Sequence, residues 1–200
     1  MAGRFAVIGS LLGLTALPVL AGVEAVPLAG DSPGGEPGGW RNQKIELVYL
    51  GFTSHYSCDG LQSKLELLLK QLGARQGFKV VSYGCDRGYG TPSRFPAARL
   101  EFATLQPLGD AALTSTAATD AATGEPAVPG AWRSVELSPR RPFELQDGDC
   151  ELMEQVRDKV LPLFAIRNLE ARLSCVPHQD TGPFSLQMQV FAPLAPAQSK

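Results

Sequence analysis

The sequence has little excess charge, few histidines and none of the short motifs that mark common enzyme sites. Its 200 residues carry 18 Lys and Arg, 20 Asp and Glu, and 2 His. Binding to phosphate groups requires a surplus of basic residues, so we expect no nucleic-acid partner. The chain also lacks Cys-x-x-Cys, Gly-x-Ser-x-Gly and a phosphate-binding Gly-rich loop. These absences argue against a thioredoxin-like, α/β-hydrolase or nucleotide site, and the sequence implies no cofactor and no metal.

Long apolar runs are missing after residues 1–25, which have the three parts of a secretory signal peptide. Arg4 provides the early cation, residues 5–20 form the apolar run, and Val23-Glu24-Ala25 has a cleavage-site pattern. Pro18 interrupts the run, which is shorter than the roughly 20 residues of a comfortable membrane-spanning helix. We therefore expect cleavage near residue 25, no membrane span in the mature chain, and a periplasmic or secreted protein. An uncleaved anchor is the alternative.

Four cysteines fall into two pairs with nearly equal spacing, Cys58 with Cys85 and Cys150 with Cys175. Cysteines of exported proteins are usually oxidised, so we expect two disulfides. Two short sequence matches also relate the halves of the chain and indicate one supersecondary unit used twice. They are Cys58-Asp59-Gly60-Leu61 with Cys150-Glu151-Leu152-Met153, and Leu105-Gln106-Pro107-Leu108 with Phe191-Ala192-Pro193-Leu194.

Two segments of low complexity divide the chain. Residues 26–40 are too rich in Gly and Pro to bury a core, and we expect a flexible leader there. Residues 109–130 contain no aromatic side chain and are expected to be a disordered linker. The expected organisation is a signal peptide at 1–25, the leader at 26–40, a single domain at 41–194 built from pseudo-repeats 41–108 and 131–194, the linker at 109–130, and a tail at 195–200.

The first repeat is predicted to fold as strand, helix, strand and strand. Ser57 can cap a helix, and leucines at spacings of three and four residues follow it, so one helix face is apolar. We expect this helix to cover residues 58–73. Runs of β-branched and aromatic residues predict strands at 45–52, 78–83 and 98–105. The apolar helix face consists of Leu61, Leu65, Leu68, Leu69 and Leu72.

The second repeat has the same order of predicted elements. Asp149 is the expected cap of a helix that begins at Cys150, and Pro162 should kink or end this helix early. Strands are predicted at 132–137, 168–175 and 185–191. The residues expected to point inward are Met153, Val156, Val160, Leu161 and Phe164 on the helix, and Leu169, Ala171, Leu173 and Cys175 on the alternating strand.

The lengths of helix and strand select a disulfide pairing. A helix rises about 1.5 Å per residue, and the strand that follows returns about 3.3 Å per residue over a similar distance. Each pair of cysteines should therefore meet, which predicts that Cys58 bonds to Cys85 and Cys150 to Cys175; pairing across the repeats is the alternative. The strands before and after each helix should run parallel.

The expected fold class is α+β. Two βαββ repeats would form one mixed, mainly antiparallel sheet of about six strands with two helices on one face and two disulfides. The other face should be polar, either solvated or a binding surface. Its outward residues are expected to be Arg99, Glu101, Glu170, Arg172, Gln187 and Gln189.

The loop at residues 86–96 is the best candidate for a recognition surface. Gly and Pro shape its backbone, and Tyr and Arg often carry the binding energy of interfaces. An ordinary hairpin connection with solvated arginines is the alternative. The candidate binding residues are Arg87, Tyr89, Arg94 and Phe95, with Arg140 and Arg141 as a weaker pair.

These observations favour an exported, disulfide-stabilised module without enzymatic activity. Such a module would bind another envelope or extracellular protein or a ligand, or serve a structural role. The alternative is a small hydrolase or metal-dependent enzyme centred on His55 with Asp59 or Asp86, which the first disulfide would bring together. The second repeat has cysteines in matching places without a histidine, which counts against that alternative.

Overall fold

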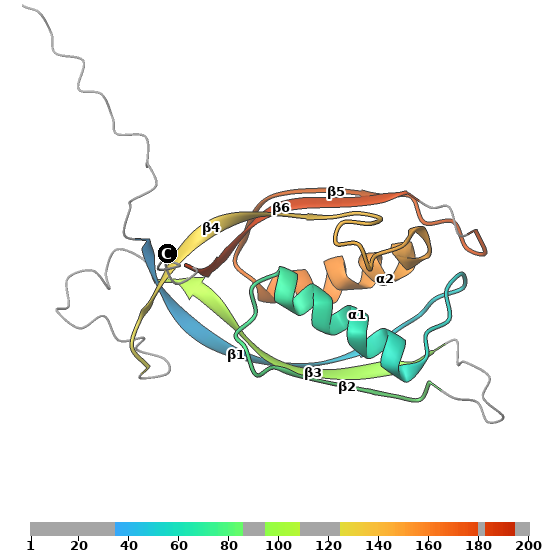
Figure 1. Ribbon diagram of the computed structural model, residues 1–200, viewed down its shortest axis with the longest axis horizontal. Helices are drawn as coiled ribbons and strands as arrows, with labels where there is room; N and C mark the ends of the chain where they lie inside the picture. The colour runs from blue at the N-terminus through green and yellow to red at the C-terminus, as the bar shows by residue number, and fades with distance from the viewer. Residues whose placement is uncertain (1–34, 86–94, 109–124, 180–182, 195–200) are drawn as a thin grey trace, which may run out of the picture. The chain divides into compact units, whose positions relative to one another are not determined.

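The computed structural model describes residues 35–85, 95–108, 125–179 and 183–194, which form one antiparallel sheet with two helices (Figure 1). The strand order is β2-β3-β1-β4-β6-β5. All described residues belong to one compact unit. In chain order the elements are β1 (Glu36–Val48), α1 (Cys58–Gln71), β2 (Lys79–Tyr83), β3 (Ala97–Pro107), β4 (Val128–Leu137), α2 (Cys150–Gln155), β5 (Ile166–Leu173) and β6 (Phe184–Pro193).

The sheet has the same topology when it is followed inward from either edge. β3 pairs antiparallel with both β1 and β2, and β6 pairs antiparallel with both β4 and β5. The two strands that flank each helix therefore run parallel, as predicted, but the third strand lies between them. Every neighbouring pair of described strands is thus antiparallel. The α+β class with two βαββ units is confirmed.

The two halves of the sheet meet through a short glycine-containing contact. Residues Glu36–Gly38 pair with Val128–Gly130. A Cβ atom at Gly38 would lie 2.7 Å from Leu105 and 2.8 Å from Phe191, and one at Gly130 would lie 2.6 Å from Phe191. Glycine is therefore needed for β1 and β4 to approach each other above these two side chains.

This contact corrects the expected limits of the leader and the linker. β1 begins at Glu36, inside the segment 26–40, and β4 begins at Val128, inside the segment 109–130. Gly-rich sequence suggested disorder there, but backbone pairing and close packing order these residues without side chains of their own. The predicted signal peptide at 1–25, residues 26–34 of the leader, residues 109–124 of the linker and the tail at 195–200 lie outside the described residues.

Both helices lie on one face of the sheet, between its two three-stranded halves (Figure 1). The predicted leucine face of α1 is buried, with no side chain more than 1% exposed. Ser57 caps α1 by accepting a hydrogen bond from the Gly60 N–H at 3.1 Å, as predicted. Gly73, which follows the helix, has φ +79°, a value that favours glycine. The expected inward residues of the second helix are also buried in the same core: Met153, Val156, Val160, Leu161 and Phe164.

The second helix differs from the first in length and in its cap. After Gln155 the chain forms a π-helical turn (Val156–Val160) and a 3-10 turn (Leu161–Leu163) that contains Pro162, so the expected early end is confirmed. Asp149 stands at the N-cap position, but its carboxylate makes no cap bond to α2. It accepts instead from the backbone N–H of Gln146, one turn earlier, at 2.7 Å.

Strand β5 departs from the predicted alternation. An extra residue interrupts its pairing with β6 between Arg167 and Glu170, and Asn168 there has φ 55°. Leu169 lies in this bulge and is 43% exposed, so its expected inward position is wrong. Ala171 and Leu173 return to the register of the core face, opposite Leu186 and Phe184, although Ala171 remains exposed at the sheet edge. Cys175, which follows the strand, is half-buried against the core.

Two disulfides join the predicted cysteines, Cys58 with Cys85 and Cys150 with Cys175. Their Cα atoms are 5.3 and 5.5 Å apart, the usual separation for a bridge. Disulfides of this kind indicate an oxidising, extracytoplasmic environment. Within the described part of the chain, none of the helices has the length and apolar character to cross a membrane.

Candidate binding site at one end of the sheet

Among the described residues outside the strands, four large apolar side chains are exposed at the end of the sheet that lies away from the β1 and β4 contact. They come from the segment between β1 and α1, the residues before β3 and the segment after β5. Their exposed fractions are between 44% and 53%. We name them the apolar tip: Leu50, Phe52, Phe95 and Val176.

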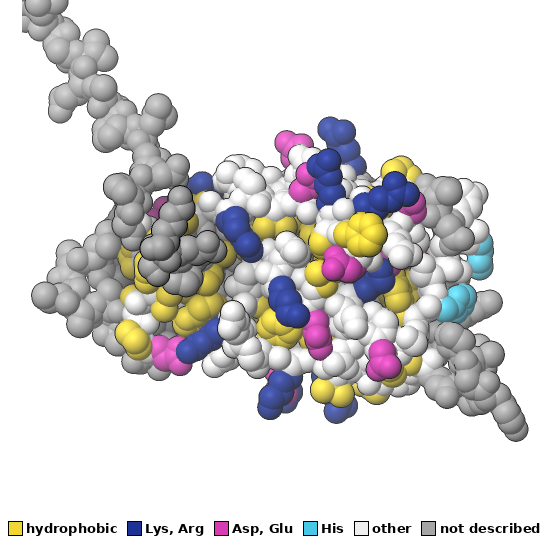
Figure 2. Space-filling view, viewed as in Figure 1, with side chains coloured by type: hydrophobic (Ala, Val, Ile, Leu, Met, Phe, Trp, Pro, Cys, Tyr) yellow, Lys and Arg dark blue, Asp and Glu magenta, His cyan; other side chains and the backbone are white. Residues whose placement is uncertain are grey.

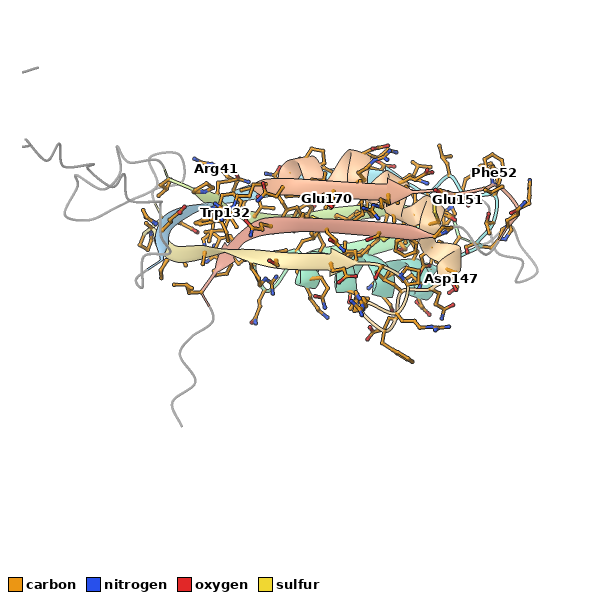
Figure 3. The ribbon with its side chains drawn as sticks, turned by 90° about the horizontal axis from the view of Figure 1, so that it is seen from above. Arg41, Phe52, Trp132, Asp147, Glu151 and Glu170 are labelled. Carbon is orange, nitrogen blue, oxygen red and sulfur yellow. A yellow bond between two sulfur atoms is a disulfide. The ribbon has the colours of Figure 1, made fainter. Side chains whose placement is uncertain are left out.

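Two side chains of α2 hold the backbone that carries Leu50 and Phe52. The Gln155 amide accepts from the Leu50 N–H at 3.1 Å and donates to the Leu50 carbonyl at 3.0 Å. One oxygen of Glu151 accepts from the backbone N–H groups of Phe52 and Thr53, at 2.8 and 2.9 Å. The backbone polar groups are therefore bonded toward α2, while half of each apolar side chain remains exposed. Figure 3 shows Phe52 at the outer end of the structure, near Glu151.

A second carboxylate, Asp149, connects the two halves beneath this segment. It is 2% exposed, and it accepts hydrogen bonds from the Tyr56 hydroxyl and the Lys64 ammonium group, both at 2.5 Å. Lys64 lies on α1, so the contact joins the first helix to the start of the second. We refer to Asp149 and Glu151 together as the carboxylate clasp. A buried carboxylate must be paired or hydrogen-bonded, and both members of the clasp are.

Two buried phenols lie against the clasp. Burial, followed by the negative charge of Glu151, raises the pKa of Tyr49. Burial, followed by the charge of Asp149, raises the pKa of Tyr56. The two rings pack edge to face with centroids 4.8 Å apart. The raised pKa keeps both hydroxyls protonated well above neutral pH, so they act as hydrogen-bond donors to the clasp, which holds this segment in place.

The other side of the tip is held by the chain after β5. The Thr53 hydroxyl donates to the carbonyl of Val176 at 3.5 Å, and the Phe52 ring lies edge-on to the His178 ring at 5.8 Å. Cys175, the residue before Val176, is bonded to Cys150 at the start of α2. Figure 2 shows both histidine side chains of the protein at this end.

Part of the binding loop that the sequence predicted, residues 86–96, lies at this end of the sheet. Phe95 belongs to the apolar tip, and the carbonyl of the next residue, Pro96, accepts from the Tyr49 N–H at 2.8 Å. The other predicted binding residues, Arg87, Tyr89 and Arg94, lie outside the described residues, and so does Asp86.

The residues of the enzyme alternative are separate from the clasp. His55 and Asp59 are both exposed, and Asp59 lies in the first turn of α1. Across the described ranges, His, Cys, Asp and Glu side chains form no group of three that could hold a metal ion. Of the weaker arginine pair, Arg141 forms an ion pair with Glu136 at 3.0 Å, and Arg140 has φ 64°.

Leu50 and Phe52 were missed because the apolar run at 45–52 suggested a strand buried on both faces. β1 ends at Val48, and beyond it Tyr49 stays buried whereas Leu50 and Phe52 are half exposed. The sequence feature that could have identified the end of the strand is Gly51, which interrupts the apolar run. Glu151 gave no comparable signal, because an acidic residue in the first turn of a helix is usually solvated.

Comparisons with known protein families, curated proteins and solved structures found no match.

Proposed function

We propose that this protein is an exported, disulfide-stabilised module without enzymatic activity, which binds another protein of the cell envelope or extracellular space through the apolar tip. It would act in the periplasm of a double-membraned bacterium and be secreted otherwise. The observation that carries the proposal is the attachment of the Leu50 and Phe52 backbone to Glu151 and Gln155.

This attachment prepares the tip for binding. A loop that is ordered before it meets its partner loses less conformational entropy on association. Fully burying a Leu or Phe side chain stabilises by roughly 1.5 to 3 kcal/mol, so four half-exposed side chains could contribute about 4 kcal/mol at an interface. This contribution suits an apolar cleft on a partner protein, with further contacts around it. Loops on a rigid scaffold commonly carry such sites.

The test compares the apolar tip with an exposed phenylalanine outside it. In the mature protein, we would replace Leu50 and Phe52 with Ser in one variant, and Phe143 with Ser in the control. Phe143 is 83% exposed beside a hollow of about 670 Å³ along α1, and it lies outside the tip. Crosslinking in the native envelope or medium, followed by mass spectrometry, identifies partners, and binding is then measured with the purified partner.

We expect the tip variant to bind the partner at least about tenfold more weakly, because it loses over 1.4 kcal/mol of apolar contact. The Phe143 variant should bind as the unaltered protein does. Equal binding by all three proteins would refute the tip, and selective loss in the Phe143 variant would place the site along α1 instead. If the purified protein floats with lipid vesicles in the absence of a partner, the ligand of the tip is a membrane and not a protein.

A further inference from the structure

Phe143 is the most exposed large apolar side chain of the described residues, with an exposed fraction of 83%. It lies in the segment between β4 and α2, beside the hollow of about 670 Å³ that runs along α1. In the view of Figures 1 and 2 this helix faces the reader, and no other described element lies in front of it. The ring is therefore exposed where the fold also leaves one side of α1 uncovered.

The loop that carries Phe143 is held by hydrogen bonds on both sides of it. Before the ring, Ser138 and Arg141 exchange two backbone hydrogen bonds, of 2.9 and 2.8 Å. After it, the Lys64 ammonium group on α1 donates to the carbonyl of Glu144 at 2.8 Å. The loop is thus fixed against the helix and presents the ring to solvent. Contact with another apolar surface would remove this exposure.

The uncovered side of α1 has opposite charges at its two ends. Asp59 lies in the first turn of the helix and Lys70 in the last. They are 70 − 59 = 11 residues apart, about three helical turns, so both lie on one side of the helix. Ser63 and Leu67 lie between them on the same side, at spacings of three and four residues. We name these four residues the α1 stripe.

The two charges of the α1 stripe are open to a partner. Within the described part of the chain, neither Asp59 nor Lys70 takes part in an ion pair or a side-chain hydrogen bond. An acid at the start and a base at the end of a helix also complement its dipole, which explains their signs within one molecule. The dipole does not explain Leu67 and Phe143, which line the hollow between them.

A second copy of the chain fits this surface when its α1 runs antiparallel to the first. Such a contact has a twofold axis, which lies midway along the α1 stripe and makes the same patch face itself. Asp59 of each copy then faces Lys70 of the other, and Leu67 and Phe143 of both copies lie between the two ion pairs. Parallel helices would instead place like charges against each other at both ends.

We propose that the α1 stripe and Phe143 form the interface of a homodimer in which the two α1 helices pack antiparallel. The helix has 14 residues, so the contact extends along about 21 Å. One helix and one aromatic ring from each copy make a small interface, and we expect a dissociation constant of about 10 to 100 µM. The residues of the apolar tip take no part in this contact, so dimerisation is independent of the protein partner there.

The test measures the mass of the purified mature protein by sedimentation equilibrium, with both disulfides intact. Concentrations span about 1 µM to about 1 mM, which brackets the expected dissociation constant, and low salt preserves the surface ion pairs. Phe143→Ser removes the ring, and Asp59→Lys and Lys70→Glu each reverse one charge of the α1 stripe. The matched control is Lys79→Glu, which reverses an exposed lysine on β2. Circular dichroism verifies that each variant keeps its helices.

The two charge reversals are specific for the antiparallel arrangement. In a dimer of either variant alone, like charges face each other at both ends of the contact. In an equimolar mixture, a dimer of one Asp59→Lys chain with one Lys70→Glu chain again has opposite charges at both ends. Surface ion pairs are individually weak, so we expect each variant alone to dimerise about fivefold more weakly and the mixed dimer to regain the original affinity within about twofold.

We expect Phe143→Ser to weaken the dimer at least about tenfold, because burial of a Phe side chain contributes at least this factor. Lys79→Glu should dimerise as the unaltered protein does, and so should the tip variant, in which Ser replaces Leu50 and Phe52. The proposal is overturned if the protein is a monomer at all concentrations, if Phe143→Ser dimerises normally, or if mixing the charge variants restores nothing. Loss of the dimer in the tip variant would overturn it as well, because the copies would then meet through the tip.

Discussion

Replacing Glu151 with Ala tests whether the carboxylate clasp determines the structure of the tip. Glu151 is 6% exposed, and its carboxylate accepts from two consecutive backbone N–H groups, those of Phe52 and Thr53. Hydrogen bonds to a charged group contribute about 1.5 to 3 kcal/mol each, which gives an upper limit of about 6 kcal/mol for the two. Both bonds are only partly buried, so water can replace some of this contribution. We therefore expect a loss of about 2 to 4 kcal/mol in the free energy of unfolding.

Two further variants separate the causes of this loss. Glu151→Gln keeps one acceptor oxygen and removes the charge, so it should lose about half as much as Glu151→Ala. Glu154→Ala removes a half-buried acidic side chain from the same helical segment without breaking a hydrogen bond to the tip, and it should change stability by less than about 0.5 kcal/mol.

The assay is urea unfolding at neutral pH with the disulfides intact, together with hydrogen exchange of single amides by NMR. The Phe52 and Thr53 amides should be protected in the unaltered protein and should exchange rapidly in Glu151→Ala. Equal stability of Glu151→Ala and Glu154→Ala, with the two amides still protected, would show that the clasp does not hold the tip.

Four other perturbations test the fold and the processing of the chain. Replacing Cys150 and Cys175 with Ala should cost about 2 to 5 kcal/mol in urea unfolding while non-reducing peptide maps still show the first bridge. Burial and a nearby carboxylate raise the pKa of Tyr56, so above about pH 10 the folded protein keeps a proton that the unfolded chain loses. The free energy of unfolding should therefore fall as the pH rises from there. In Tyr56→Phe this fall should be less steep by about 1.4 kcal/mol per pH unit. Gly130→Ala should cost about 1 to 3 kcal/mol through overpacking, and a change below about 0.5 kcal/mol would contradict the close approach of the strands. Intact-mass measurement of the exported protein should show an amino terminus near Val26; retention of the leader would show that it is an anchor.

Most of the fold followed from local patterns in the sequence. The leucine spacing after Ser57 predicted α1 and its buried face, because a helix brings residues three and four apart to one side. The disulfide pairing followed from the lengths of helix and strand alone. Pro162 correctly predicted the short second helix. These features depend on neighbours along the chain, and a single sequence records them well.

Contacts between the two halves could not be predicted in this way. Gly38 and Gly130 suggested disorder, and only their closeness to Leu105 and Phe191 explains why they belong to strands. Glu151 resembled a solvated residue of a first helical turn, and its burial depends on a segment about 100 residues earlier in the chain. Such contacts leave no periodic signal. The apolar tip and the clasp were therefore missed, except for Phe95.

The differences between the two halves are informative because their architecture is the same. Trp40 and Trp132 hold equivalent positions in β1 and β4, and each lies beneath an arginine, Arg75 at 5.4 Å and Arg167 at 4.3 Å. Where the fold alone sets the requirement, the halves keep similar residues. On the outer face they do not. The row Lys44, Glu101 and Lys79 of the first half contains two cations and one carboxylate, whereas the row Glu136, Gln187 and Glu170 of the second contains two carboxylates. Each row takes part in one ion pair among the described residues, Lys44 with Glu101 at 2.6 Å and Glu136 with Arg141 at 3.0 Å. The fold therefore constrains the residues that pack against the core and the tryptophans, and it leaves the charge of these exposed rows free to differ.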